Sequence, residues 1–315
     1  MKSDRPTRWI YPLIGFLLLV FSLCILQQQL ERYNLADILH SLSLISDRQL
    51  FLALSWAFLS CLIISSYDLI AFHHLNHYLD NKRILFATFV TYAISNTTGF
   101  TLLIGGGIRY RFYSLWGVPT RIIAKIIALG NLTFWLGLLT LGGIVFVFDP
   151  VPLPHSFAVK ISAIRYLGIV ALLLVATYLC CSSRRQRLKI KGRVVRFPKL
   201  TTSLAQISLF SLDWMLSAAI LYCLIAEYPN KSYGQFFDIY LVSMTASIMS
   251  NVPGGIGIFE TIIMFLLPQS IPTPDVLGSL LVYRAIRFLL PLAIALALII
   301  CFEIRRRLKK IYRSK

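Results

Sequence analysis

Long apolar stretches, separated by short polar or basic segments, dominate the hydropathy pattern of this chain. A helix needs roughly 20 apolar residues to cross the hydrocarbon core of a bilayer, which is about 30 Å thick. The pattern predicts full membrane spans at residues 9–26, 50–72, 122–148, 161–181, 204–226 and 277–302. We therefore expect an all-α polytopic membrane protein with about six full spans, forming one integral membrane domain over residues 1–315.

Two further apolar segments are interrupted in the middle. Residues 84–108 contain the run SNTTG at 95–99 and a triple glycine at 105–107, and residues 236–267 contain the run SNVPGGIGIFE at 250–260. Proline lacks an amide hydrogen, and glycine permits backbone angles that side chains forbid, so both runs break a helix. Hydrocarbon tolerates such backbone only where protein or a wet cavity surrounds it. The segments predict two re-entrant helix–break–helix hairpins, with pairs of short full spans as the alternative.

The distribution of basic residues indicates which side of the membrane each loop occupies. Eight basic and no acidic residues fall in 184–199, and seven more basic residues fall in 305–315. The positive-inside rule places the loop 182–200 and the tail 303–315 in the cytoplasm, together with both termini. The net charge of +18 is concentrated in runs that adjoin spans and not in a folded basic domain, so nucleic-acid binding is not expected.

The two halves of the chain, residues 1–148 and 161–302, follow the same order of two spans, a hairpin and a final span. The second half is inserted upside down, which makes an inverted 4+4 repeat. Asp68 and Asp213 occupy corresponding spans, and the two hairpins share the pattern S-N-x-x-G. Broken helices of this kind hold the substrate of many secondary transporters. The expected broken-helix site comprises Asn96, Gly99, Asn251, Pro253, Gly254, Gly255, Gly257 and Glu260.

Ionisable residues inside the apolar segments are candidates for function. Glu260 and Arg284 lie at the same depth, about 10–15 Å from the outer boundary at 1.5 Å per residue, and are expected to pair. The pair is either a structural lock or a partner of a phosphate site, in which Arg284 or Arg287, beside Tyr283, binds a lipid headgroup through its planar fork. Asp68 and Asp213 are either proton carriers or structural carboxylates.

Arg109 and Arg111 follow the triple glycine on the cytoplasmic side. One interpretation is that both side chains snorkel to the interface, where Tyr110, Tyr113 and Trp116 form an aromatic belt. The other is that they capture a lipid phosphate entering from the inner leaflet.

Motifs for metal, redox or nucleotide chemistry do not emerge from the sequence. The histidines of His73-His74-x-x-His77 have the spacing of a metal pair but no thiol or carboxylate companion, so no metal is expected. The six cysteines include no C-x-x-C pair. G-x-S-x-G, P-loop and H-E-x-x-H motifs are also absent, so neither a cofactor nor a hydrolytic or nucleotide-driven enzyme is expected.

Three runs resemble one known family. They are residues 96–99 with 106–114, residues 253–260, and Tyr283-Arg284 with Leu290-Pro291. Together they are similar to the transmembrane region of the lysylphosphatidylglycerol synthase/flippase family, the multiple peptide resistance factors, and its stand-alone membrane relatives. The resemblance implies a flippase of the bacterial cytoplasmic membrane that moves phospholipid, aminoacylated or anionic, between leaflets. Arg287 stands where the family is expected to have an aromatic residue.

The sequence departs from the bifunctional members of that family after its basic tail. Residues 1–315 contain no region that resembles the C-terminal acyltransferase domain of those members, so we expect a stand-alone form that is not an enzyme. The alternative function is a non-catalytic membrane subunit that presents lipid to, or scaffolds, a separately encoded lipid-modifying enzyme. A synthase in its own right is a third, weaker hypothesis. The headgroup, the energy source and a homo-oligomeric state are left open.

Overall fold

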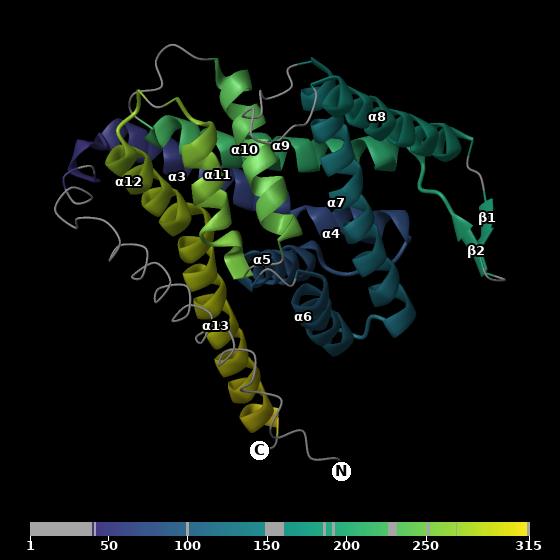
Figure 1. Ribbon diagram of the computed structural model, residues 1–315. Helices are drawn as coiled ribbons and strands as arrows, with labels where there is room; N and C mark the ends of the chain where they lie inside the picture. Colours follow the sequence, from purple (N-terminus) through teal and green to yellow (C-terminus); the bar gives the residue numbers. More distant parts are fainter. Residues whose placement is uncertain are drawn as a thin grey trace.

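The computed structural model describes residue 40 and residues 42–98, 101–148, 161–184, 187–190, 193–225, 232–250, 253–268 and 270–313. Most of these residues lie in helices that pack into one bundle (Figure 1). The predicted first span, residues 9–26, lies outside the described residues.

Among the described residues, five helical segments are long and apolar enough to cross a membrane. They are Asp47–His74, which contains α3 (Asp47–Ser65) and α4 (Tyr67–His74); α7 (Thr120–Phe148); Ser162–Ser183 within α8 (Ile161–Ser183); α9 (Leu200–Leu224); and Thr273–Leu308. Each coincides with one of the predicted spans at 50–72, 122–148, 161–181, 204–226 and 277–302. The helical class is confirmed, whereas the total number of spans and the inverted repeat stay predictions.

The first interrupted segment forms two helices that pack against each other, α5 (Asn81–Thr98) and α6 (Thr101–Leu115). α5 includes the first four residues of the run SNTTG, and residues 99–100 lie outside the described part. The prediction of a second break at the triple glycine is wrong, because α6 runs through it without interruption. Gly105 serves close packing instead: a Cβ there would lie 2.8 Å from the Ser95 hydroxyl oxygen on α5.

The second interrupted segment has the predicted helix–break–helix form. α10 (Tyr233–Met249) is followed by the short helix η2 (Pro253–Gly255) and by α11 (Ile258–Leu266). Gly254, Gly255 and Gly257 have φ angles of 62°, 60° and 86°, in the left-handed region that favours glycine. At Gly255 a Cβ would also lie only 1.6 Å from the Ser247 hydroxyl oxygen. Whether either hairpin is re-entrant in the membrane stays a prediction.

The basic segment between α8 and α9 contains a small antiparallel sheet of β1 (Arg187–Ile190) and β2 (Arg193–Arg196), with Arg187 opposite Arg196. The helical class holds for the bundle, and this short hairpin inside the basic loop 182–200 is a local feature that the hydropathy pattern did not predict. Basic and apolar residues alternate along 187–190, which is the period of a strand and not of a helix. In Figure 1 this sheet lies at the edge of the molecule, away from α13.

The last helical segment comprises α12 (Thr273–Arg284), a π-helical turn, η3 (Ala285–Leu289), and α13 (Leu290–Arg313). Pro291 lacks the amide hydrogen that the carbonyl of Arg287 would accept in a regular α-helix, which favours a local change of helical pitch. α13 continues through the predicted tail at 303–315 as far as Arg313, so most of the tail is an extension of the last helix. Its end projects beyond the rest of the bundle (Figure 1).

The apolar core is divided into two clusters. The larger one is built mainly from α9, α10, α11 and α12, with contributions from α3 and α7, and contains Leu221, Phe236 and Tyr240. The smaller one joins α4, α5, α6, the start of α7 and α13, and contains Ile84 and Phe112. This division positions the site, because polar side chains gather where the two clusters meet.

Candidate functional site

A cavity of about 520 Å³ lies between the two clusters. Its polar lining residues come from both halves of the chain: Tyr67, Tyr92, Asn96, Arg109, Asn131, Asp213, Ser217, Tyr240, Ser247 and Arg287. Aromatic and aliphatic side chains complete the wall, among them Phe134, Trp135, Phe210, Trp214, Met244 and Phe288. A cavity with an apolar wall and a few convergent polar groups is the usual form of a ligand site.

Residues from both predicted helix breaks reach this cavity. Asn96 lines it from the end of α5, and Gly254 and Gly255 line it from η2. The two hairpins also touch, since a Cβ on Gly254 would lie 3.3 Å from the carbonyl oxygen of Thr97. The predicted members Gly99 and Asn251 lie outside the described residues, and Pro253 opens η2. The structure therefore brings Asn96, Gly254 and Gly255 together at one place.

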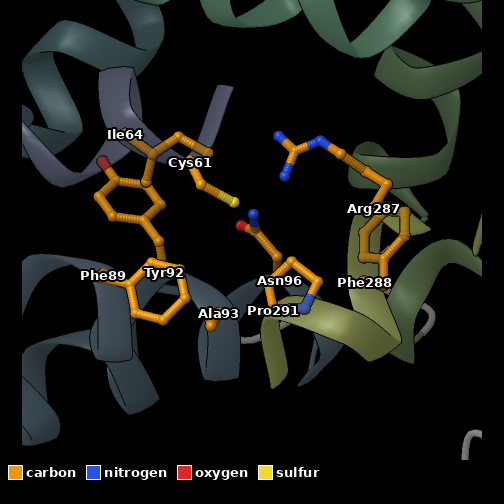
Figure 2. Close-up of a pocket in the computed structure, with 9 residues that line it drawn as sticks. All are labelled: Cys61, Ile64, Phe89, Tyr92, Ala93, Asn96, Arg287, Phe288 and Pro291. Atoms are coloured by element: carbon orange, nitrogen blue, oxygen red, sulfur yellow. The ribbon is translucent and has the colours of Figure 1, made fainter. Parts of the chain in front are cut away.

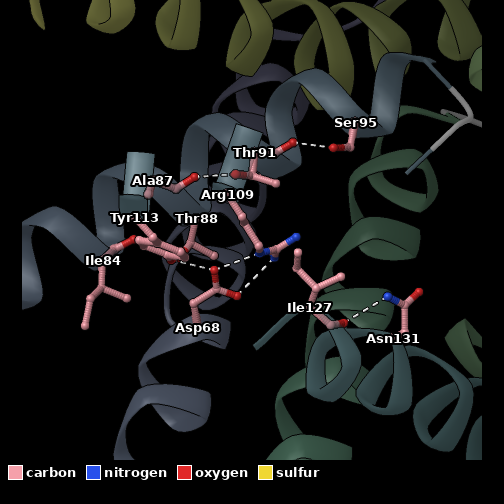
Figure 3. Close-up of polar contacts among 10 residues, drawn as sticks. All are labelled: Asp68, Ile84, Ala87, Thr88, Thr91, Ser95, Arg109, Tyr113, Ile127 and Asn131. Carbon is pink, nitrogen blue, oxygen red and sulfur yellow. Dashed lines mark hydrogen bonds and ion pairs between the residues drawn. The ribbon is translucent and has the colours of Figure 1, made fainter. Parts of the chain in front are cut away.

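Asp68 and Arg109 form a buried, bidentate ion pair (Figure 3). Arg109 donates from Nε to Asp68 Oδ2 at 2.8 Å and from Nη2 to Oδ1 at 3.0 Å. Tyr113 donates its hydroxyl to Oδ2 at 2.6 Å. Arg109 is only 6% exposed and Tyr113 is fully buried. The interpretation that Arg109 snorkels beside an aromatic belt is thus wrong, because a carboxylate on α4 holds its guanidinium inside the protein.

The surroundings of Arg109 leave its orientation fixed. Its guanidinium carbon lies 5.2 Å from the centre of the Tyr92 ring, within range of a cation–π contact. The hydroxyls of Thr88 and Thr91 on the facing helix donate to carbonyls one turn back on that helix (Figure 3). These two hydroxyls therefore form hydrogen bonds within α5 and not with Arg109. The ion pair with Asp68 holds the guanidinium in place.

Asp213 and Arg287 form a second ion pair with looser geometry. Arg287 Nη2 lies 3.5 Å from Asp213 Oδ1, and Arg287 Nε donates to the Ser217 hydroxyl at 2.9 Å. The Ser60 hydroxyl donates to the same carboxylate oxygen at 2.5 Å. The Arg287 side chain also lines a small pocket next to the large one, together with Cys61 and Asn96 (Figure 2).

Glu260 and Arg284 form the pair that the sequence predicts, and that prediction is confirmed. Arg284 donates from Nε to Glu260 Oε1, from Nη1 to the Gly254 carbonyl at 3.1 Å, and from Nη2 to the Gly255 carbonyl at 3.4 Å. Glu260 Oε2 accepts from the Gly257 amide at 2.8 Å, at the start of α11. The pair thus connects α12 to the broken helix. It also supplies hydrogen bonds to the carbonyls of Gly254 and Gly255 and to the amide of Gly257.

Tyr283, Arg284 and Glu260 are not among the residues that line the cavity. Tyr283 is fully buried, and its hydroxyl lies 2.7 Å from the hydroxyl of Tyr240, which does line it. Arg111 is separate as well, because it pairs with Glu303 of α13. Of the five predicted headgroup residues, the structure brings Arg109 and Arg287 to one cavity and places Tyr283, Arg284 and Arg111 elsewhere.

Several polar residues of the site were missed by the sequence analysis. Ser60, Ser217, Tyr67 and Tyr240 lie in segments whose hydropathy predicts only spans, and nothing in their spacing singles them out. Tyr92 stands four residues before Asn96 in the sequence, and this spacing puts both on one face of a helix. That signal could have been read, given that Asn96 was already a candidate.

Comparison with known proteins gives the family. The model of the family described as "Lysylphosphatidylglycerol synthase TM region" matches residues 9–295. An uncharacterised protein of Synechocystis, slr0712, is 39% identical over 92% of this chain and 91% of its own length. The inner membrane protein YbhN of Escherichia coli is 34% identical over 81% of this chain and 80% of its own length.

A longer relative matches more weakly. The phosphatidylglycerol lysyltransferase of Staphylococcus aureus is 26% identical over 89% of this chain, and the match covers 32% of that protein. The part of this relative that matches is thus about a third of its length. The family model, by contrast, covers residues 9–295 of the present chain. This chain belongs to the family of the lysylphosphatidylglycerol synthase transmembrane region.

Proposed function

We propose that this protein moves phospholipid between the leaflets of a bacterial inner membrane and holds the headgroup in the central cavity while it does so. One observation carries the proposal. The cavity joins both helix breaks to two buried arginines, Arg109 and Arg287, inside an otherwise apolar wall. A guanidinium fork matches the oxygens of a phosphate, and the aromatic and aliphatic wall suits the glycerol and the start of the acyl chains.

Surface exposure supports a lateral entrance for the acyl chains. Trp135 on α7 and Ile248 on α10 line the cavity, yet they are 55% and 38% exposed. Both therefore belong to the cavity and to the outer surface at once. An opening between α7 and α10 would let the headgroup enter the protein while the acyl chains stay in the membrane.

The relatives narrow the substrate and the location. YbhN is named an inner membrane protein, and the staphylococcal relative is named for lysine transfer to phosphatidylglycerol. We propose phosphatidylglycerol or its aminoacylated form as the substrate, and no catalytic role for this chain. The second candidate, a subunit that presents lipid to a lipid-modifying enzyme, is favoured by the staphylococcal match, in which the shared region is part of a longer lysyltransferase.

Reconstitution separates the two functions. The purified protein is placed in liposomes with fluorescent phosphatidylglycerol, and a membrane-impermeant quencher reports which leaflet holds the label. We expect faster transfer than in protein-free liposomes, and loss of most of that gain in Arg287→Gln. Arg165→Gln removes an exposed arginine from α8 and is the matched control. Transfer at the protein-free rate, with phosphatidylglycerol still bound, would favour the presenting subunit.

The predicted membrane topology belongs to the same proposal. Single cysteines introduced in 182–200 should be labelled only from the cytoplasmic side, and single cysteines in 268–275 only from outside. Labelling of 182–200 from outside intact cells would contradict the re-entrant hairpins and the inverted repeat of 1–148 and 161–302, together with the cytoplasmic termini.

A further inference from the structure

Arg287 is held less tightly by its partners than the other two buried arginines, Arg109 and Arg284. Its Nε donates to Ser217, its Nη2 lies 3.5 Å from Asp213, and its Nη1 has no hydrogen-bond partner among the described residues. A separation of 3.5 Å is at the outer limit of a hydrogen bond. Arg109, by contrast, holds Asp68 through two nitrogens, and Arg284 holds one carboxylate and two carbonyls.

The position of Arg287 brings its side chain to the cavity. It lies in the π-helical turn η3, and π-helical turns within helices are frequent at functional sites. The side chain lines both the large cavity and the smaller pocket beside it. In Figure 2 its guanidinium points toward the space in front of Cys61 and Asn96.

Asp213 depends on Arg287 for compensation of its charge. Ionisable groups that interact electrostatically with this carboxylate include Cys61, Tyr67, Tyr92, Tyr240, Tyr283 and Arg287. Thiols and phenols are ordinarily neutral near pH 7, which leaves Arg287 as the cation in this set. Arg109 lines the same cavity but is held by Asp68. The Ser60 hydroxyl adds one hydrogen bond to Asp213 and no charge.

We propose that Arg287 binds the anionic phosphate of the headgroup in exchange for Asp213, and that Asp213 takes up one proton as it is displaced. This inference rests on the proposed function and supplies a proton link to it. Asp213 is then the internal anion of the empty cavity. The headgroup replaces it on the guanidinium, and lipid release returns Arg287 to Asp213.

The proton follows from the cost of a buried charge. Once the phosphate occupies Arg287, the Asp213 carboxylate is surrounded by neutral side chains, and an unpaired buried carboxylate is relieved by protonation. The carboxylate gains one proton from solvent when the lipid arrives and returns it when the lipid leaves. One negative charge and one proton enter together, so the net charge inside the protein is unchanged.

The link predicts the sign of a pH effect. The lipid-bound protein holds one more proton than the free protein, so affinity for an anionic headgroup rises as pH falls. One linked proton gives at most about a tenfold change in affinity per pH unit.

Calorimetry on the unaltered protein gives the primary test. Short-chain phosphatidylglycerol is titrated into the detergent-solubilised protein in two buffers with different heats of ionisation. The difference in binding heat reports the protons taken up, and we expect close to one per lipid at pH values where Asp213 is ionised in the free protein. Uptake of no proton from pH 6 to 8 would overturn the inference, whatever any variant does.

Two matched variants locate the proton. Asp213→Asn removes the internal anion, so its affinity at pH 8 should rise about tenfold and lose its pH dependence. Asp68→Asn alters the other ion pair and should keep the dependence of the unaltered protein. An unchanged pH dependence in Asp213→Asn, or its loss only in Asp68→Asn, would contradict the assignment.

A second ligand distinguishes this inference from the proposed function. Glycerophosphoglycerol carries the same phosphodiester without acyl chains, and we expect it to bind at least tenfold more weakly than the lipid. Equal binding with one proton taken up would support the exchange at Arg287 but point to a water-soluble ligand, against lipid transport. Lipid transfer without proton uptake would leave the proposed function standing and refute the exchange.

Discussion

The two carboxylates that correspond in the predicted repeat, Asp68 and Asp213, are both buried and both paired with arginine, yet their pairs differ in geometry. The Asp68–Arg109 pair is bidentate and is joined by a tyrosine hydroxyl. The Asp213–Arg287 pair meets at one separation of 3.5 Å, and its arginine divides its donors between a carboxylate and a serine.

The difference indicates that similar residues in corresponding spans have different roles. A bidentate pair that a tyrosine hydroxyl also joins resists the arrival of another anion, because several hydrogen bonds would have to be replaced at once. A pair held at one point can exchange partners at lower cost. The comparison supports the proposal that Arg287 exchanges its carboxylate for the ligand, while Arg109 lines the cavity and stays paired with Asp68, which holds α4 against α6.

The largest expected effect comes from breaking the tight pair. Asp68→Ala leaves Arg109 buried without its partner, and we expect a loss of roughly 3–5 kcal/mol in the free energy of unfolding. Asp213→Ala should cost less than half as much, because that pair is looser and its arginine reaches the cavity. Unfolding in mixed micelles, followed by tryptophan fluorescence, measures both. Equal losses would remove the distinction between the pairs.

A third pair, Glu260–Arg284, differs from the other two because its arginine also donates to two backbone carbonyls. Either single charge reversal should destabilise the protein by an amount similar to Asp68→Ala. The exchange Glu260→Arg with Arg284→Glu should recover roughly 0.5–3 kcal/mol, the range of coupling between neighbouring residues. Recovery should be partial, because a carboxylate at 284 cannot donate to the carbonyls of Gly254 and Gly255.

Leaflet transfer measured on the same exchange variant extends that test. We expect transport to stay low because the break in the second hairpin loses its support. Arg284→Lys, which keeps the charge, is the control for folding. Full recovery of both stability and transport would show that the pair acts only through its charges.

The hydroxyl partners of the two carboxylates provide a finer comparison. Tyr113→Phe removes one hydrogen bond to Asp68 and should cost about 1.5–3 kcal/mol of stability, as for a bond to a charged group. It should leave lipid affinity unchanged. Ser60→Ala removes the corresponding bond to Asp213 and should change lipid affinity as well, since it alters the anion that competes for Arg287. A change of lipid affinity in Tyr113→Phe alone would reverse the two assignments.

The smallest effect is expected at Arg111. Its ion pair with Glu303 is partly exposed, with side chains 13% and 12% accessible. Arg111→Ala should therefore cost about 1 kcal/mol or less, the range of pairs that remain in contact with solvent. If Arg111 also receives lipid at the cytoplasmic face, transfer will slow while stability barely changes. Arg121→Ala, on the exposed start of α7, is the matched control.

Much of the architecture could be predicted from the sequence, because hydropathy over a window of about 20 residues depends on composition and not on partners. The five described spans, the break at Pro253–Gly255 and the pairing of Glu260 with Arg284 are of this kind. The depth argument worked for that pair because each residue lies a countable distance from the same boundary.

The sequence by itself determined that this is a multi-span helical protein of one family, with charged residues at depth and a glycine-rich break. Only the tertiary structure decided which charges meet. Arg109 and Arg111 are two positions apart, yet one is buried on Asp68 and the other meets Glu303, because residues two apart on a helix point in different directions. Arg284 and Arg287 likewise differ: Arg284 donates to the carbonyls of the helix break, and Arg287 lines the cavity. Partners contributed by distant helices set those roles, and no local pattern contains them.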